Sequence, residues 1–229
     1  MTPPAGRRIP GEPGSFPMSD PFDAATTALL VIDMQKDFCA ARGYMHNLGC
    51  DLERLERPIA PIQAVLAAAR AAGLWIGHTR EGYAADLSDL QPWKKNGPAN
   101  EAIGVAGPLG RALVRGEPGW DFLDALQPIP GEHVYDKTSY GAFVSTTLEA
   151  DLRSAGMTRL ILTGVTTDCC VTSTLREALD RGFDTVVLED CVTAASALRH
   201  DAALDIIRHA GGVFGNLGRS GDVIGALQG

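Results

Sequence analysis

Short runs of consecutive apolar residues recur along this chain, separated by segments with helical periodicity. The clearest runs are TTALLVID at 26–33, LWIGH at 74–78, RLILTGV at 159–165 and TVVLED at 185–190. Continuous apolar runs of this length are typical of strands buried on both faces. A more alternating run at 133–137 and a short one at 212–217 complete the strands that the pattern predicts.

The segments between these runs predict helices. Residues 58–73 are rich in alanine, with a proline at the start and a glycine at the end. In the helix expected at 145–156, Thr146 and Glu149 have the spacing of a capping box. Two more helices are expected, at 169–181 and at about 195–210.

Alternation of strands and helices predicts an α/β fold. We expect a three-layer α/β/α, doubly wound architecture with a mainly parallel sheet of about six strands and right-handed crossovers. Residues 1–24 are rich in proline and glycine and are expected to form an arm, and residues 25–229 a single domain. The pattern fails between Arg80 and Trp120, and a connection of that length is usually functional or disordered.

Composition narrows the classes of partner. The chain has 229 residues, 45% of them hydrophobic, and a formal net charge of −8. The apolar share predicts a folded chain, and the acidic balance disfavours nucleic acid or an anionic membrane surface as a partner. A small neutral or cationic ligand remains the expected partner.

The cysteine pattern excludes two further classes. Five cysteines at irregular spacing, without a CxxC pair, predict neither a secreted disulfide framework nor a structural zinc site. The N-terminal stretch lacks the apolar core of a signal peptide, and no apolar run is long enough to span a bilayer. We therefore expect a soluble, cytoplasmic protein.

Three kinds of reactive side chain directly follow predicted strands. Asp33 closes the first run, Lys137 closes HVYDK, and Cys169 and Cys170 come just after RLILTGV. Each has an ordinary structural interpretation, because an Asp often caps a turn, a Lys is usually solvated and a Cys is often a small core residue. Ligands in parallel sheets bind beyond the carboxyl ends of the strands, so the coincidence of all three predicts an active site there.

The cysteine pair lies where a thiol is readily activated. Asp168 is a candidate N-cap, which would place both cysteines in the first turn of a helix. Free backbone N–H groups and the helix dipole there favour a thiolate and can also hold an oxyanion. The core-facing stripe of this helix includes Val171 and Leu175, and the two cysteines lie on opposite flanks of it. Periodicity therefore leaves both as candidate nucleophiles.

Three motifs, ALLVIDMQKDF, DKTSYGAF and TGVTTDCCVTST, resemble those of the isochorismatase-like cysteine hydrolases, which have a Rossmann-like fold. The resemblance runs from about residue 26 to 217. It implies an Asp33–Lys137–Cys170 triad, because the family nucleophile directly precedes a valine. It also implies an oxyanion hole made by the N–H groups of Thr166 and Cys170, and a cis peptide bond ahead of Thr166.

Within the family, the cysteine favours an amidase over an ether-cleaving isochorismatase. The region after the second strand has one histidine, His78, and lacks the Asp and two His of nicotinamidases, so we predict no metal and no other cofactor. Segments such as HTREGYAADLSDL and RGEPGWD are similar to the biuret hydrolases, which release ammonia from a linear urea oligomer. Ala210 stands where those enzymes place a glutamine, which favours a longer homologue such as triuret.

Other substrate contacts are expected at the same edge of the sheet. The candidates are Phe38, Arg80, Glu81, Gln35 and Tyr140, together with Ala210. Family resemblance also implies a homo-oligomer, with a tetramer expected by analogy.

Alternative functions stay open at this point. One is an amidohydrolase for ureidoacrylate or another N-carbamoyl acid, whose carboxylate Arg80 or Arg115 would bind. A second is a catalytically silent interaction protein. A third, a redox switch between the neighbouring cysteines, is disfavoured by the strained ring that it would close.

Overall fold

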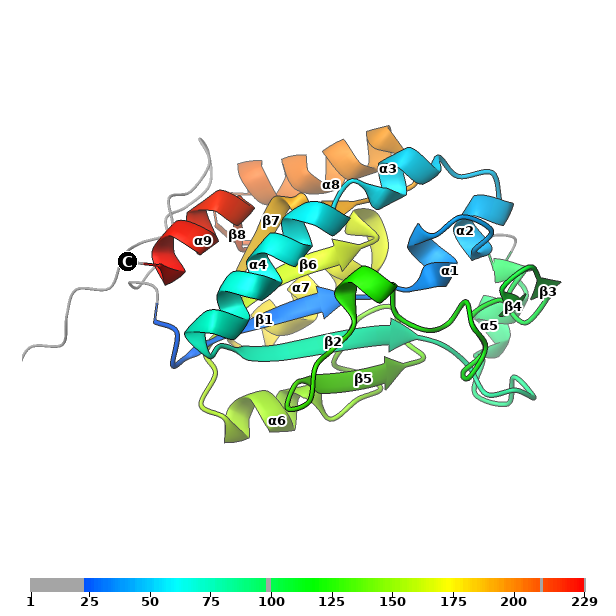
Figure 1. Ribbon diagram of the computed structural model, residues 1–229, viewed down its shortest axis with the longest axis horizontal. Helices are drawn as coiled ribbons and strands as arrows, with labels where there is room; N and C mark the ends of the chain where they lie inside the picture. The colour runs from blue at the N-terminus through cyan, green and yellow to red at the C-terminus, as the bar shows by residue number, and fades with distance from the viewer. Residues whose placement is uncertain (1–22, 98–99, 211, 229) are drawn as a thin grey trace, which may run out of the picture.

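The computed structural model (Figure 1) describes residues 23–97, 100–210 and 212–228. Most of the expected arm, residues 1–22, lies outside the described residues. Within the described ranges, no helix is both long and apolar enough to cross a membrane.

A six-stranded parallel sheet forms the centre of the molecule. Its strands are β1 (Thr27–Ile32), β2 (Trp75–Glu81), β5 (His133–Lys137), β6 (Arg159–Val165), β7 (Asp184–Thr193) and β8 (Asn216–Gly218). Every residue of β1 and β6 is buried, as their continuous apolar runs predict. The predicted α/β fold with a parallel sheet of six strands is confirmed.

Strand order predicts a ligand site at the carboxyl ends of the central strands. The order is β5-β2-β1-β6-β7-β8, so the chain winds outward from β1 in one direction and then returns to the other side of it. The two halves meet between β1 and β6, and open sheets of this kind bind ligands at that crevice. Gly164 allows the close approach there: its φ is +108°, and a Cβ at this position would lie 2.0 Å from the carbonyl oxygen of Ile32.

Helices cover both faces of the sheet. On one face lie α4 (Ile59–Ala72) and α9 (Ser220–Leu227), which run in front of the strands in Figure 1. On the other face lie α6 (Leu148–Ser154), α7 (Thr172–Asp180) and α8 (Ala197–His209). Alternate residues of β1 serve the two layers, Leu29 and Val31 on the α4 side and Leu30 and Ile32 on the α7 side.

Several short elements were not expected from the sequence. Three one-turn helices precede α4: α1 (Lys36–Cys39), α2 (Tyr44–Asn47) and α3 (Leu52–Glu56). The long connection after β2 contains α5 (Pro92–Lys95) and a hairpin of β3 (Ala106–Gly107) and β4 (Gly110–Arg111). A 3-10 turn, η2 (Asp124–Leu126), follows it.

The capping box predicted for the 145–156 helix is wrong. Helix α6 begins at Leu148 with Thr147 as its N-cap, and Thr147 makes no side-chain capping bond. The Thr146 hydroxyl instead accepts a hydrogen bond from the Leu148 N–H at 3.1 Å. The Glu149 carboxylate is drawn to the guanidinium of Arg181 at 3.0 Å, since an ion pair is available on that side of the helix.

The turn that carries the cysteines also differs from expectation. Residues Thr167–Val171 form a π-helical turn, η3, ahead of α7. Asp168 does not cap it, because its carboxylate pairs with Arg199 of α8 at 3.0 Å. A π-helical turn takes one more residue per hydrogen bond than an α-turn, and such turns often occur at functional sites.

Candidate active site

A buried ion pair joins the ends of two strands. The Lys137 Nζ at the end of β5 lies 2.8 Å from Oδ2 of Asp33, which follows β1, and neither side chain is exposed to solvent. Thr79 of β2, the strand between them, donates its hydroxyl to the other Asp33 oxygen at 2.6 Å. Lys137 also donates to the backbone carbonyl of Ser139 at 2.9 Å. The pair therefore has the additional hydrogen bonds that buried charges require.

The backbone of Asp33 adopts a left-handed conformation, with φ of +52°. Non-glycine residues rarely take this conformation, although Asp tolerates it better than most. The Asp33 N–H is held by the carbonyl and hydroxyl oxygens of Thr79, each at 3.1 Å. Local strain of this kind often marks a functional position.

The thiol of Cys170 faces two carboxylates. It donates to Glu81 Oε2 at 3.6 Å, and suitable atoms of Asp33, Glu81 and Cys170 all lie within 4.8 Å of one another. Glu81 closes β2, and its Oε2 also lies 3.6 Å from Lys137 Nζ. The structure thus brings together all three residues of the expected triad and adds Glu81 to them.

Burial and neighbouring charges set the pKa of each member. Burial raises the pKa of Asp33, even though the nearby Lys137 ammonium opposes the shift. Burial by itself would lower the pKa of Lys137, but the charges of Asp33, Cys170 and Glu81 together raise it, so the ammonium stays charged. Asp33 is therefore a stronger base than an ordinary aspartate.

Glu81 and Cys170 shift in opposite directions. Burial raises the pKa of Glu81, but Lys137 and Lys94 outweigh it and bring the net value below the ordinary range. The pKa of Cys170 is raised, by its neighbour Cys169, by burial and by the two carboxylates. In the resting site the thiol is protonated, and a base must remove its proton before it attacks.

A cavity of about 290 Å³ opens onto Cys170. Glu81, Cys169, Cys170 and Tyr140 line it, and Phe38 and Ile103 contribute apolar walls. Thr166 also borders the cavity, and the peptide bond between Val165 and Thr166 is cis, as the resemblance implies. Of the expected substrate contacts, Phe38, Glu81 and Tyr140 therefore meet the same space as the thiol.

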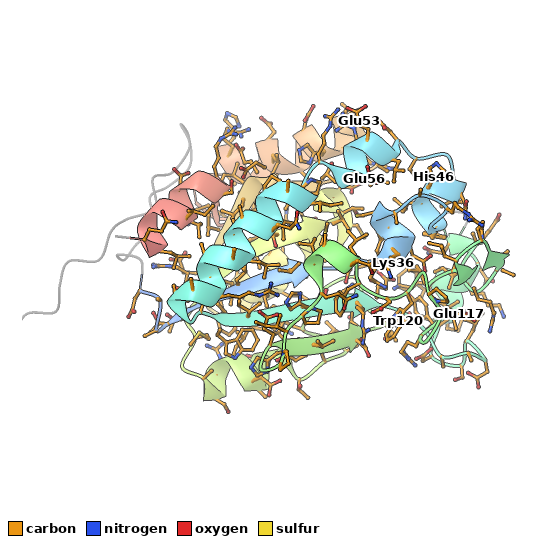
Figure 2. The ribbon with its side chains drawn as sticks, viewed as in Figure 1. Lys36, His46, Glu53, Glu56, Glu117 and Trp120 are labelled. Atoms are coloured by element: carbon orange, nitrogen blue, oxygen red, sulfur yellow. The ribbon has the colours of Figure 1, made fainter. Side chains whose placement is uncertain are left out.

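Other expected contacts point elsewhere. Arg80 precedes Glu81 on β2, and successive strand residues face opposite sides of a sheet. Its guanidinium lies 3.7 Å from the ring centroid of Trp120, which Figure 2 labels near the end of β2, and pairs with Asp136 at 2.8 Å. Arg80 is not among the described residues that line the cavity.

Gln35 and Ala210 are also absent from the described lining of this cavity. The Gln35 amide is buried and exchanges hydrogen bonds with the backbone of Glu81, accepting from its N–H at 2.8 Å and donating to its carbonyl at 3.0 Å. It therefore supports Glu81 from behind. Ala210 is the C-cap residue of α8.

Sequence patterns missed two residues at the site. Lys94 of α5 and Tyr83 are both buried, and Lys94 Nζ donates to Glu81 Oε1 at 3.2 Å and to the Tyr83 hydroxyl at 2.7 Å. Tyr83 in turn donates to Glu81 Oε1 at 2.7 Å. A lysine within a polar loop is normally expected to be exposed to solvent, and nothing in the local sequence distinguishes Lys94 from Lys95.

The Asp33, Glu81 and Cys170 ligand atoms are close enough together to suggest a metal site. Lys137 Nζ, however, lies 2.8 Å from Asp33 and 3.6 Å from Glu81, so an ammonium already supplies positive charge to both carboxylates. A divalent ion in the same place would face that ammonium at short range. This donor set therefore suits Lys137 better than a metal.

A larger hollow of about 570 Å³ lies between β7 and α8. Glu189 within it pairs with Arg208 and, at 3.5 Å, with Arg219. The thiol and its proposed base lie at the smaller cavity, and Cys170 is not among the described residues that line this hollow.

Comparison with known proteins identifies the fold family. Residues 27–217 match the isochorismatase domain. The chain belongs to the isochorismatase domain family. Within this family, it is 34% identical over 201 residues to the ureidoacrylate amidohydrolase RutB of Variovorax paradoxus (strain S110), covering 82% of this chain and 79% of that protein.

Solved structures of isochorismatase-like proteins share the architecture. A cysteine hydrolase from Pseudomonas syringae pv. phaseolicola 1448A superposes with a TM-score of 0.77 at 25% identity, covering 100% of this chain and 99% of the other. N-carbamoylsarcosine amidase from Thermoplasma acidophilum gives a TM-score of 0.64 at 24% identity, covering 85% and 96% of the two chains, a likeness of fold.

Proposed function

We propose that this isochorismatase-family protein is a cysteine-dependent amidohydrolase that cleaves the terminal C–N bond of a ureido group and releases ammonia. The observation that carries the proposal is the buried Asp33–Lys137 pair within reach of the Cys170 thiol. A thiol, a base and an orienting cation are the parts that nucleophilic amide hydrolysis needs.

Asp33 is the proposed base for the thiol. Both carboxylates near Cys170 are candidates by distance, but burial raises the pKa of Asp33 whereas two lysines lower that of Glu81. The carboxylate with the higher pKa takes the proton more readily. Lys137 then orients Asp33 and stabilises the remaining negative charge.

The proposed reaction has two stages. The Cys170 thiolate attacks the terminal carbamoyl carbon, and the N–H groups of Thr166 and Cys170 hold the oxyanion. Asp33 returns its proton to the leaving nitrogen, ammonia departs, and a thioester remains. Water activated by Asp33 then hydrolyses the thioester, which frees the thiol and a carboxylated product.

Charge at the cavity disfavours an anionic substrate. Of the described lining residues, Glu81, Asp168 and Arg199 carry charge, and −1 − 1 + 1 leaves a formal −1. Arg199 is already paired with Asp168. A neutral, NH2-rich molecule such as the linear urea oligomers biuret and triuret suits this surface, because Glu81 can accept hydrogen bonds from a terminal amino group.

A second candidate is a ureido acid. It is supported by the similarity to a ureidoacrylate amidohydrolase and by the position of Arg199, 65% exposed at the side chain, on the lining of the cavity. A substrate carboxylate would have to displace Asp168 from this arginine. The two candidates share the reaction and differ in the charge of the substrate's far end.

Ammonia release from a panel of biuret, triuret, ureidoacrylate, N-carbamoylsarcosine and nicotinamide tests the proposal. We expect the highest kcat/KM with biuret or triuret and an unchanged rate after treatment with a chelator. Preference for ureidoacrylate would select the second candidate. No release from any member of the panel would sink the amidohydrolase proposal.

A further inference from the structure

A second buried lysine reaches the site from the long connection after β2. Lys94 lies in α5, and its side chain is only 1% exposed. Its Nζ donates to Glu81 Oε1 at 3.2 Å, to the Tyr83 hydroxyl at 2.7 Å and to the Thr138 carbonyl at 2.8 Å. These contacts use all three ammonium protons, so the ammonium is held in one place.

An aromatic ring completes the surroundings of this ammonium. Lys94 Nζ lies 3.9 Å from the centroid of the Tyr140 ring, a distance at which a cation is attracted to the ring face. Tyr140 also lines the cavity beside Cys170. Lys94 therefore packs behind two residues that line the cavity, Glu81 and Tyr140, although the segment around it is largely exposed.

Glu81 links the two lysines of the site. Its Oε1 receives Lys94 and Tyr83, while its Oε2 faces Lys137 and the Cys170 thiol, each at 3.6 Å. With both lysines, the formal charges of Asp33, Glu81, Lys137 and Lys94 sum to zero (−1 − 1 + 1 + 1). Without Lys94, two buried carboxylates would share one ammonium, and the sum would be −1.

We propose that Lys94 is a positioning residue, which keeps Glu81 ionised and directs its Oε2 toward Cys170 and the substrate. Because Tyr83 and Lys94 both bind Oε1, the carboxylate cannot rotate without breaking two hydrogen bonds. The role in substrate turnover rests on the proposed function, whereas the electrostatic role does not. The 82–121 connection thus supplies a residue on which the reaction depends.

Steady-state kinetics test the role of Lys94 in substrate turnover. We expect Lys94→Met to lower kcat/KM about 100-fold near pH 7, as for other displaced active-site groups. Its activity should also begin at a higher pH than that of the wild type, because loss of the cation raises the pKa of Glu81. Lys94→Arg should keep the wild-type acid limb. Lys95→Met, which removes the same charge from the exposed neighbour, should match the wild type.

The acid limb separates this role from a structural one. Besides Lys94 and Tyr83, the titratable groups whose charges interact with Glu81 are Asp33, Tyr44, Lys137, Tyr140, Cys169 and Cys170. None of these residues is replaced in the Lys94 variants. A Lys94→Met enzyme that is slower at every pH, with its acid limb at the wild-type position, would overturn the proposal.

Alkylation of Cys170 gives a readout that needs no substrate. The rate of reaction with iodoacetamide at pH 8, followed by peptide-resolved mass spectrometry, reports the thiolate fraction. We expect Lys94→Met to slow alkylation about threefold or more, because a lost positive charge raises the pKa of the thiol. If no substrate is turned over but alkylation slows, the proposed function fails while the charge role of Lys94 stands.

A second background protects the test against misfolding. Lys94→Met alone leaves Glu81 and Asp33 to share the single ammonium of Lys137, whereas Glu81→Gln/Lys94→Met removes one negative and one positive charge together. The double variant should react with iodoacetamide about threefold or more slowly than Glu81→Gln alone. A cooperative thermal transition shows which variants are folded. If alkylation is not slowed by Lys94→Met in a background where the protein is folded, the proposal is overturned.

Discussion

Glu81 Oε2 lies 3.6 Å from the Cys170 sulfur, close enough to accept the thiol proton, yet the charges around Glu81 make it the weaker base of the two carboxylates at the site. Asp33, which is held by Lys137 and Thr79, is the stronger base. The carboxylate that accepts the hydrogen bond of the thiol in the resting site is thus not the stronger base.

Replacement of the two neighbouring cysteines should have very different effects. Cys170→Ser should lower ammonia release on the order of 10³-fold or more, because a serine at this position is a poorer nucleophile. Cys169→Ser should retain activity to within a factor of about ten. Steady-state rates with the best substrate of the panel decide between them, and loss confined to Cys169→Ser would assign the chemistry to the other thiol.

Breaking the Asp33–Lys137 pair should destabilise the fold as well as the site. Lys137→Met leaves a fully buried carboxylate without its cation, which costs about 3–5 kcal/mol in other proteins. Denaturation by urea measures this loss. Arg57→Ala, which breaks an exposed pair with Glu53, should cost less than about 1 kcal/mol. Equal midpoints for the two variants would contradict the buried-pair assignment.

Arg199 should distinguish the two substrate classes. With a urea oligomer, Arg199→Ala should change kcat/KM by less than about threefold, because the arginine pairs with Asp168 and not with substrate. With a ureido acid, the same change should raise KM about tenfold or more by removing a carboxylate partner. Arg176→Ala on α7, an exposed arginine outside the described lining of this cavity, is the matched control.

Protein stability should fall in mild acid because of His78. Burial lowers the pKa of this histidine below its usual 6.5, and its Nε2 lies 2.9 Å from Glu132. Below pH 6.5 the unfolded chain therefore takes up a proton more readily than the folded one, so the free energy of unfolding decreases as pH falls.

Comparison of histidine variants checks this prediction. In chemical denaturation series between pH 7 and 5, His78→Gln should show a shallower loss of stability than the wild type. His46→Gln changes an exposed histidine, labelled in Figure 2, and should keep the wild-type slope. An unchanged slope in His78→Gln would assign the pH dependence to other groups.

The sequence by itself determined the fold class and the chemical centre. Short continuous apolar runs that alternate with helical segments predict strands covered on both faces, and hence a parallel sheet with helices on each side. Reactive residues directly after such strands lie at the carboxyl ends of the sheet, which is why Asp33, Lys137 and the cysteine pair were predictable. The choice of Cys170 within the pair came from the family resemblance. The type of helical turn around the cysteines was not predictable, because five residues are too few for a sequence pattern to distinguish a π-helical turn from an α-helical one.

Only the tertiary structure decided which other side chains join the site. Arg80 and Glu81 are neighbours in the sequence, but the alternation of β2 directs Glu81 to Cys170 and Arg80 to Trp120. Lys94 and Lys95 look alike in the sequence, yet Lys94 alone is buried, since the connection after β2 packs it against Glu81. Contacts between residues far apart in the sequence determine which of these side chains are buried at the site, and the local sequence pattern does not reveal those contacts.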